Sequence, residues 1–154
     1  MKSLRVHGQS KRYHHKYIGM GGRMDTLQCT IVDVKLKHYA KDLALRQEVA
    51  VKYTEALKGK DLVLPFVDKK TTSVWAQYSV RVKNRDYMQA KLKEQGIPTA
   101  VHYPLPLHLQ ECFNYLGYKK GDFPISEQIS NEIMSLPMNP YLNDKEVEYI
   151  AKFI

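Results

Sequence analysis

The chain has 154 residues, 44% of them hydrophobic and 26% charged, which is typical of a folded globular domain and excludes a wholly disordered chain. No apolar run is long enough to cross a bilayer, and the charged N-terminus lacks the apolar core of a signal peptide. Cys29 and Cys112 lie far apart with no C-x-x-C motif, which favours reduced thiols and a cytoplasmic location.

The formal net charge of +8 is concentrated near the N-terminus. The first 23 residues contain no acid and six cations, namely Lys2, Arg5, Lys11, Arg12, Lys16 and Arg23. Such a segment suits an anionic partner, such as phosphate, nucleic acid or an acidic substrate, although a solvated basic surface has the same composition. The segment has few aliphatic residues and no regular period, so we expect a loop that gains order by packing against something else.

Two helical stretches are predicted after this basic loop. Apolar residues recur at helical spacing over 24–36 and again over 43–57. Asp25 lies at the start of the first stretch, where the helix dipole favours a carboxylate, and Gly59 can end the second as a C-cap. We therefore expect a basic loop segment over 1–23, left over from a larger domain, a long helical connection over 24–58, and a small domain over 59–154.

Short strands and helices alternate in the rest of the chain. Residues 74–82 alternate as a strand does, with the apolar face made by Val74, Ala76, Tyr78, Val80 and Val82. Further strands are predicted at 96–101 and 133–138, and helices at 84–96, 107–116, 124–131 and 144–153. Pro124 suits a first helical turn, and Asn143 suits an N-cap. This order predicts an α/β or α+β fold with a small, mostly antiparallel sheet flanked by helices.

Two loops carry side chains suited to ligand binding. The Gly-rich turn 19–22 leads through Arg23 into the first predicted helix, which can make an anion site, although an ordinary tight turn explains the same pattern. In the loop 101–108, two prolines fix the backbone beside His102 and Tyr103 just after a predicted strand. His102 could instead be satisfied inside a packed crossover. The histidines and cysteines have no metal-site spacing, and no nucleic-acid-binding motif is visible, so we expect neither a metal nor nucleic acid.

Ordered motifs along the whole chain point to one family. They are Arg5-x-His7-Gly8, Tyr13-x-His15, Gly19-x-x-x-Arg23-Met24-Asp25-x-x-Gln28, Gln77-Tyr78-x-x-Arg81, Gly96-Ile97-x-Thr99-x-x-His102-Tyr103-Pro104-x-Pro106-Leu107-His108, Gly121-Asp122-Phe123-Pro124-x-Ser126-Glu127 and Ser135-Leu136-Pro137-Met138-x-Pro140-Tyr141. In these motifs the chain resembles the C-terminal part of sugar-nucleotide aminotransferases of the DegT/DnrJ/EryC1/StrS family. The resemblance implies the small domain of an aspartate-aminotransferase-like fold, pyridoxal 5'-phosphate as cofactor, and a homodimer with shared active sites.

The resemblance also implies which roles this chain can and cannot fill. The family's Schiff-base lysine belongs to a large domain upstream, so we expect no catalytic residue here and no transaminase activity from this chain alone. Many members have Asn where Gly21 stands, which leaves only the backbone N–H of Gly21 for the cofactor phosphate.

The subgroup that the motifs resemble most aminates a UDP-linked 3-keto-N-acetylhexuronate, commonly from glutamate, for surface polysaccharide such as O-antigen. Arg23, His102 and Tyr103 are the expected substrate-binding residues, with Arg23 suited to a carboxylate or diphosphate. The alternative is a non-catalytic fragment that acts only as a folded dimerisation module.

Overall fold

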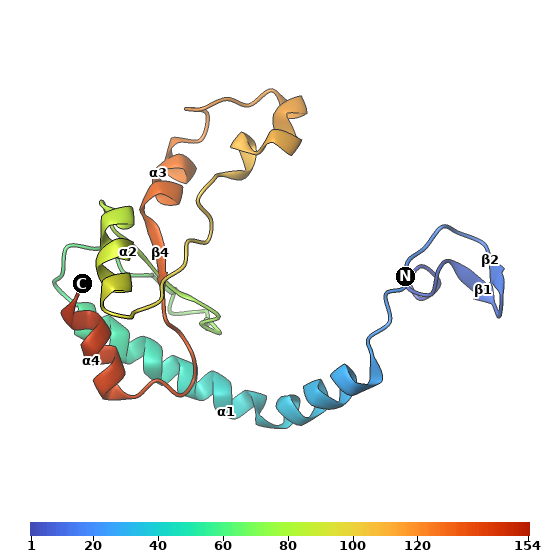
Figure 1. Ribbon diagram of the computed structural model, residues 1–154, viewed down its shortest axis with the longest axis horizontal. Coiled ribbons are helices and arrows are strands. Elements are labelled where there is room, and N and C mark those ends of the chain that lie inside the picture. The colour runs from blue at the N-terminus through green and yellow to red at the C-terminus, as the bar shows by residue number, and fades with distance from the viewer. The chain divides into compact units, whose positions relative to one another are not determined.

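The structure is a computed structural model that describes residues 1–154 (Figure 1). The chain forms two compact units, Met1–Ala40 and Lys41–Ile154. The division lies inside one long helix, α1 (Thr26–Leu57), which replaces the two separate helices that the sequence predicts. The reason is that residues 37–42 contain neither glycine nor proline to stop the helix. The boundaries at residues 23 and 58, between the loop segment, the helical connection and the small domain, stay predictions from the sequence.

A short hairpin precedes α1 in the first unit. Strands β1 (Gln9–Lys11) and β2 (His14–His15) pair antiparallel, and an isolated antiparallel bridge joins Val6 to Gly21. Only glycine fits at position 8 of this loop, because a Cβ there would lie 1.6 Å from the carbonyl oxygen of Tyr17. Gly8 is also the only residue of 1–23 that is buried. The basic segment therefore folds back on itself by backbone hydrogen bonds, without a hydrophobic core.

The second unit is built on an antiparallel pair of strands, β3 (Tyr78–Arg81) and β4 (Ile133–Leu136). Single bridges add Val63 beside β3 and Ala100 beside β4. The helices of this unit are α2 (Arg85–Glu94), α3 (Pro124–Glu132) and α4 (Asp144–Lys152), which follow α1 in chain order (Figure 1). Two 3-10 helices, η1 (Leu107–Leu109) and η2 (Glu111–Leu116), lie between α2 and α3. This arrangement agrees with the expected fold class.

The core lies on one face of the β3–β4 pair. Tyr78 pairs with Leu136 and Val80 with Met134, and all four side chains are buried. The last part of α1 covers them together with α2 and α4, through Val49, Ala50, Tyr53, Leu57, Leu92, Val147, Ile150 and Ala151. The alternation read from the sequence thus identifies the correct inner face of β3. The opposite face holds the intervening pairs, Ser79 with Ser135 and Arg81 with Ile133.

Several predicted elements differ from those in the structure. The strand predicted at 74–82 is only β3, because Trp75 has a positive φ of 47° that breaks the extended backbone. The strand predicted at 96–101 is reduced to the bridge at Ala100, since Pro98 has no N–H for a ladder. The helix predicted at 107–116 is η1 and η2, separated by the extended residue Gln110.

The predicted helix ends are confirmed. Asn143 caps α4 in a capping box with Glu146, Pro124 lies in the first turn of α3, and Gly59 has a φ of 80° just after α1. No helix of the structure is both long enough and apolar enough to cross a membrane.

Candidate functional site

His102 is held against the outer face of the sheet by a pair of serine hydroxyls. Its Nδ1 lies 3.0 Å from Ser135 Oγ, and Ser135 Oγ lies 2.8 Å from Ser79 Oγ on the neighbouring strand. Ser135 is buried, whereas Ser79 is half-buried. The bridge between Ala100 and Ser135 explains the contact, because it brings the segment that ends at His102 alongside β4. One ring nitrogen of His102 is therefore satisfied inside the protein, as the alternative interpretation of this loop requires.

His102 also lines two cavities of the second unit. A cavity of about 400 Å³ is lined by the loop 102–107 with Gln110, Ile133 and residues of α3. A smaller cavity of about 260 Å³ extends over the ends of the strands, past Gln77, Thr99 and Ser135. His102 lines both cavities, and its Nε2 makes no hydrogen bond in the structure. The imidazole is thus fixed at Nδ1 and open to a ligand at Nε2.

Tyr103 follows at the mouth of the larger cavity. Its side chain is 74% exposed, and its ring meets the His102 ring edge to face with centroids 5.8 Å apart. The phenol makes no hydrogen bond within the chain, so it is free to meet a ligand or another protein surface. The structure thus brings the two predicted residues of this loop together.

Gly21 and Arg23 lie in the first unit, before α1. Gly21 stands opposite Val6 in a narrow antiparallel pair, which is flanked by the bonds from His7 N to Met20 O and from Gly22 N to Arg5 O. In such a non-hydrogen-bonded pair the N–H and C=O of both residues point away from the partner strand. The Gly21 N–H is therefore turned outward and can donate to an anion. This geometry fits the backbone-only contact to a cofactor phosphate.

The space beside Gly21 is limited by His7. A Cβ on Gly21 would come within 3.2 Å of His7 Cε1 and 3.5 Å of His7 Nε2. A side chain at position 21 would therefore have to displace the imidazole. The position of the His7 ring in this loop therefore depends on the absence of a side chain at residue 21.

The helix terminus after Arg23 is already occupied. Asp25 Oδ1 accepts hydrogen bonds from Leu27 N at 2.8 Å and from Gln28 N at 3.4 Å. The chain's own carboxylate therefore takes two amides of this helix terminus, so the predicted anion site relies on Arg23 and the Gly-rich turn. Arg23 itself is exposed and makes no hydrogen bond or ion pair within the chain. Its guanidinium is thus not used to tie the turn to backbone carbonyls.

A second histidine that the motifs include is structural. His108 Nε2 lies 3.0 Å from Glu127 Oε1, and the same oxygen accepts a 2.7 Å bond from the Gly121 N–H. These contacts, the Gly121 bond first, hold the pKa of the Glu127 carboxyl below its usual value. The pair joins η1 to α3 and to the turn before it. These residues belong to two separate sequence motifs, and no local pattern predicts the contact between them.

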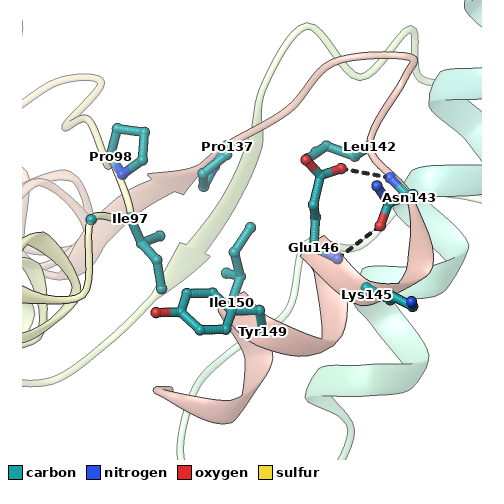
Figure 2. A pocket seen from close by; sticks show the side chains of 10 residues that line it. Ile97, Pro98, Pro137, Leu142, Asn143, Lys145, Glu146, Tyr149 and Ile150 are labelled. Carbon is teal, nitrogen blue, oxygen red and sulfur yellow. Dashed lines mark hydrogen bonds between the residues drawn. The ribbon is translucent and has the colours of Figure 1, made fainter.

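A further cavity contains none of the predicted site residues. This cavity has a volume of about 500 Å³ and lies between the turn 96–98 and the first turns of α4. Figure 2 shows Ile97, Pro98 and Pro137 on one side and Tyr149 and Ile150 of α4 on the other, with the Asn143–Glu146 capping bonds at the rim. Its lining is mainly apolar, and of its polar members Glu146 is used in the capping box with Asn143, so this cavity adds nothing to the predicted site.

Ser135 and Ser79 are the site residues that sequence analysis missed. Serines in a strand carry no chemical signal by themselves, although Ser135 begins one of the recognised motifs. Their role follows only from the register that pairs Ser79 with Ser135. The alternating pattern of β3 placed Ser79 on the outer face, which was the one available hint.

Comparison with known proteins covers the whole chain. The pattern of the DegT/DnrJ/EryC1/StrS aminotransferase family matches residues 1–154. A UDP-2-acetamido-2-deoxy-3-oxo-D-glucuronate aminotransferase of Pseudomonas aeruginosa is 41% identical over 151 residues. A dTDP-3-amino-3,6-dideoxy-alpha-D-galactopyranose transaminase of Aneurinibacillus thermoaerophilus is 38% identical over 151 residues. Each match takes in 98% of this chain, and the chain spans 41% of the length of each relative.

Solved structures agree with these matches. A DegT DnrJ EryC1 StrS aminotransferase from Brucella abortus has a TM-score of 0.88 and 34% identity, over 99% of this chain and 41% of that one. S. venezuelae DesV, solved in complex with a ketimine intermediate, has a TM-score of 0.91 and 28% identity over the same shares. The chain therefore belongs to the DegT/DnrJ/EryC1/StrS aminotransferase family.

Proposed function

We propose that this chain is the C-terminal part of a pyridoxal-phosphate-dependent transaminase that moves an amino group onto the keto group of a UDP-linked sugar. The observation that carries the proposal is the match of all 154 residues to the aminotransferase family, together with 41% identity to a relative named for a UDP-linked 3-oxo-glucuronate. That name favours a 3-keto-N-acetylhexuronate as substrate. Glutamate is the proposed amine donor, and biosynthesis of surface polysaccharide such as O-antigen is the proposed setting.

Each predicted site residue has a distinct role in this proposal. His102 Nε2 and the Tyr103 hydroxyl contact the sugar nucleotide from the mouth of the cavity on the second unit. The Arg23 guanidinium binds the sugar carboxylate or the diphosphate, because a planar cation suits both groups. The outward N–H of Gly21 donates to the cofactor phosphate. When bound, pyridoxal phosphate supplies the electron sink for amine transfer, and the lysine that anchors it comes from a segment outside these 154 residues.

The assembly that we propose is a cytoplasmic homodimer in which the two protomers share their active sites. Two features support it. The Tyr103 hydroxyl makes no hydrogen bond within its own chain, and the Arg23 guanidinium has no hydrogen-bond or ion-pair partner there. Both residues are therefore available to complete a site made with another subunit.

A second candidate function is a folded module that self-associates and does not bind cofactor. The specific observation in its favour is the first half of α1, where Leu27, Ile31 and Val34 share one helix face and are 49–75% exposed. Such an apolar surface suits contact with another protein. The chain's 41% share of its relatives' length is compatible with this candidate too.

A chimera separates the two candidates. The matching 151 residues of the Pseudomonas aeruginosa relative would be replaced by this chain, and 2-oxoglutarate release would be measured with glutamate and the UDP-linked 3-oxo-glucuronate. Turnover well above that of free pyridoxal phosphate supports the proposed function. A chimera that folds and binds cofactor but does not turn over any keto-sugar nucleotide contradicts it. Self-association of the isolated chain, alongside an inactive chimera, would support the module instead.

A further inference from the structure

We propose that Ser135 is a positioning residue for His102 and that Ser79 completes the same hydrogen-bond chain, so that Nε2 of His102 is presented to the sugar-nucleotide substrate in one fixed orientation. This inference rests on the proposed function, because it assigns a purpose to His102 at that site. Its evidence is the unbroken path His102 Nδ1, Ser135 Oγ, Ser79 Oγ, with successive separations of 3.0 and 2.8 Å.

Ser135 is a rigid support for the ring. Its N–H donates to the Ala100 carbonyl at 2.7 Å, and its carbonyl accepts from the Ala100 N–H at 3.2 Å. The side chain is only 4% exposed, and Ser79 lies directly opposite in the β3–β4 register. A hydroxyl fixed in this way can impose its direction on a neighbour more strongly than a loop residue can. Because His102 is two residues beyond Ala100, the bridge between Ala100 and Ser135 also fixes the position of the imidazole relative to β4.

The direction of the hydrogen bond at Nδ1 of His102 determines whether Nε2 is a donor or an acceptor. A neutral imidazole has one N–H, and the partner of one ring nitrogen selects which nitrogen carries it. If Ser135 donates to Nδ1, then Nε2 carries the proton and becomes a donor, and Ser79 supplies the bond that Ser135 accepts. If Nδ1 donates to Ser135, then the Ser135 hydroxyl donates its own hydrogen bond to Ser79 Oγ, and Nε2 becomes an acceptor.

The hydrogen bonds of the Ser135 and Ser79 hydroxyls can therefore reverse their direction together. A single buried serine could make only one of these arrangements without an unused polar group, and an unused buried group is costly. With Ser79 present, both arrangements are fully bonded at Ser135. The pair thus holds the ring in place while it leaves Nε2 able to meet either a hydroxyl or an anionic group of the substrate.

Nitrogen NMR of the full 154-residue chain, labelled with ¹⁵N-histidine, tests the arrangement without any enzyme activity. The six histidines are resolved by the loss of one pair of signals in His102→Gln. We expect the Nδ1 shift of His102 in the parent chain to indicate a hydrogen-bonded nitrogen, whichever tautomer is present. In Ser135→Ala the Nδ1 and Nε2 shifts should both move toward those of a freely exchanging imidazole, and in Ser79→Ala they should move in the same sense by less.

Thr54→Val is the matched control. It removes a hydroxyl that contacts the Tyr78 hydroxyl at 2.9 Å on the opposite face of the same sheet, so it should cost stability but leave the His102 signals unchanged. Unchanged His102 shifts in folded Ser135→Ala would overturn the proposal. If Ser135→Ala does not fold, Ser79→Ala decides the matter alone, because Ser79 is only half-buried, and unchanged shifts there would equally overturn it.

The connection to substrate is tested separately in the chimera. Ser135→Ala should lower kcat/KM about 10-fold or more, whereas Ser135→Thr, which keeps the hydroxyl, should restore most of it. Altered His102 shifts in an inactive chimera would leave the positioning role intact and refute the proposed function. Altered shifts with unchanged kcat/KM in an active chimera would overturn the purpose assigned to the hydroxyl pair.

Discussion

We predict that the hydroxyl of Tyr53 contributes measurably to the free energy of unfolding. It is fully buried in the last part of α1, and its hydroxyl donates to the Pro137 carbonyl at 2.8 Å, just after β4. Its ring stacks on Tyr78 with centroids 4.9 Å apart. Tyr53→Phe keeps the ring and the stacking but removes the hydroxyl. The substitution therefore isolates one hydrogen bond between α1 and the strand that carries Ser135.

The expected cost follows from what the deleted hydroxyl leaves behind. A net hydrogen bond contributes about 0.5–1.5 kcal/mol, and a buried carbonyl left without a partner costs about 1–3 kcal/mol. Pro137 is half-buried, so water can partly replace the phenol. We therefore expect a loss of about 1–2 kcal/mol in the free energy of unfolding. For a unit of this size, roughly 4 °C per kcal/mol gives a Tm about 4–8 °C lower.

Tyr141→Phe is the matched control. Tyr141 is 72% exposed, and its hydroxyl contacts Asp42 at 3.1 Å, so the same chemical deletion occurs in water. Its cost should be within about 0.5 kcal/mol of zero. Urea unfolding followed by circular dichroism and tryptophan fluorescence would compare both variants with the parent chain. Equal losses in the two variants would refute the argument that burial makes the Tyr53 bond important.

Alkaline pH provides an independent measurement on the same residue. Burial raises the pKa of Tyr53 and of Tyr78 above the usual value for a phenol. Above pH of about 10 the unfolded chain releases these protons while the folded chain keeps them, so stability is present below that pH and is lost as pH rises. Each such group contributes a slope of about 1.4 kcal/mol per pH unit. Tyr53→Phe should therefore have a shallower alkaline loss than the parent, and an unchanged slope would contradict the burial of an ionisable Tyr53.

Three further predictions concern the candidate site and its support. Arg23→Ala in the chimera should reduce kcat/KM on the 3-oxo-glucuronate by about 30-fold or more, with a much smaller loss on a matched sugar nucleotide lacking the acid, and equal losses would refute the carboxylate role. Glu127→Gln should destabilise the chain at neutral pH, and the difference from the parent should shrink as pH falls through the lowered pKa of the Glu127 carboxyl, which acid titration of unfolding would detect. The isolated 154-residue chain with pyridoxal phosphate and glutamate should show no visible absorption band of a lysine-bound cofactor and no transamination above free cofactor, and either signal would contradict the proposed place of the anchoring lysine.

The sequence predicted the elements whose cause is local. The apolar spacing of α1, the alternation of β3 and the caps at Gly59 and Asn143 each depend on residues close in the chain. The two predicted helices of α1 are one helix because no glycine or proline interrupts residues 37–42, and the two strand errors arose where one residue's backbone overrides a pattern. Trp75 turns the chain out of a strand, and Pro98 prevents a full ladder beside β4.

The candidate site was predictable in part for the same reason. His102 and Tyr103 were found because prolines and a strand end mark their loop, and the structure places them together. Ser135 was not found as the partner of His102 because that contact joins residues 33 positions apart through a register that no local pattern specifies. Asp25 was recognised as favourable to a helix start, but its consequence for external anions requires the actual hydrogen bonds to Leu27 and Gln28.

Hydrogen exchange should distinguish the two units most directly. The amides of His7, Met20 and Gly22 have backbone partners at 2.8–3.1 Å, yet almost no side chain of 1–23 is buried and six cations repel one another there. The Ser135 amide has a 2.7 Å partner inside a buried sheet. Opening energies follow the burial around a bond more than its length, so in the isolated chain the first group should exchange close to unprotected rates while Ser135 stays protected up to global unfolding. Protection of His7, Met20 and Gly22 comparable to that of Ser135 in a demonstrated monomer would refute the expectation that residues 1–23 need a partner surface for stable order.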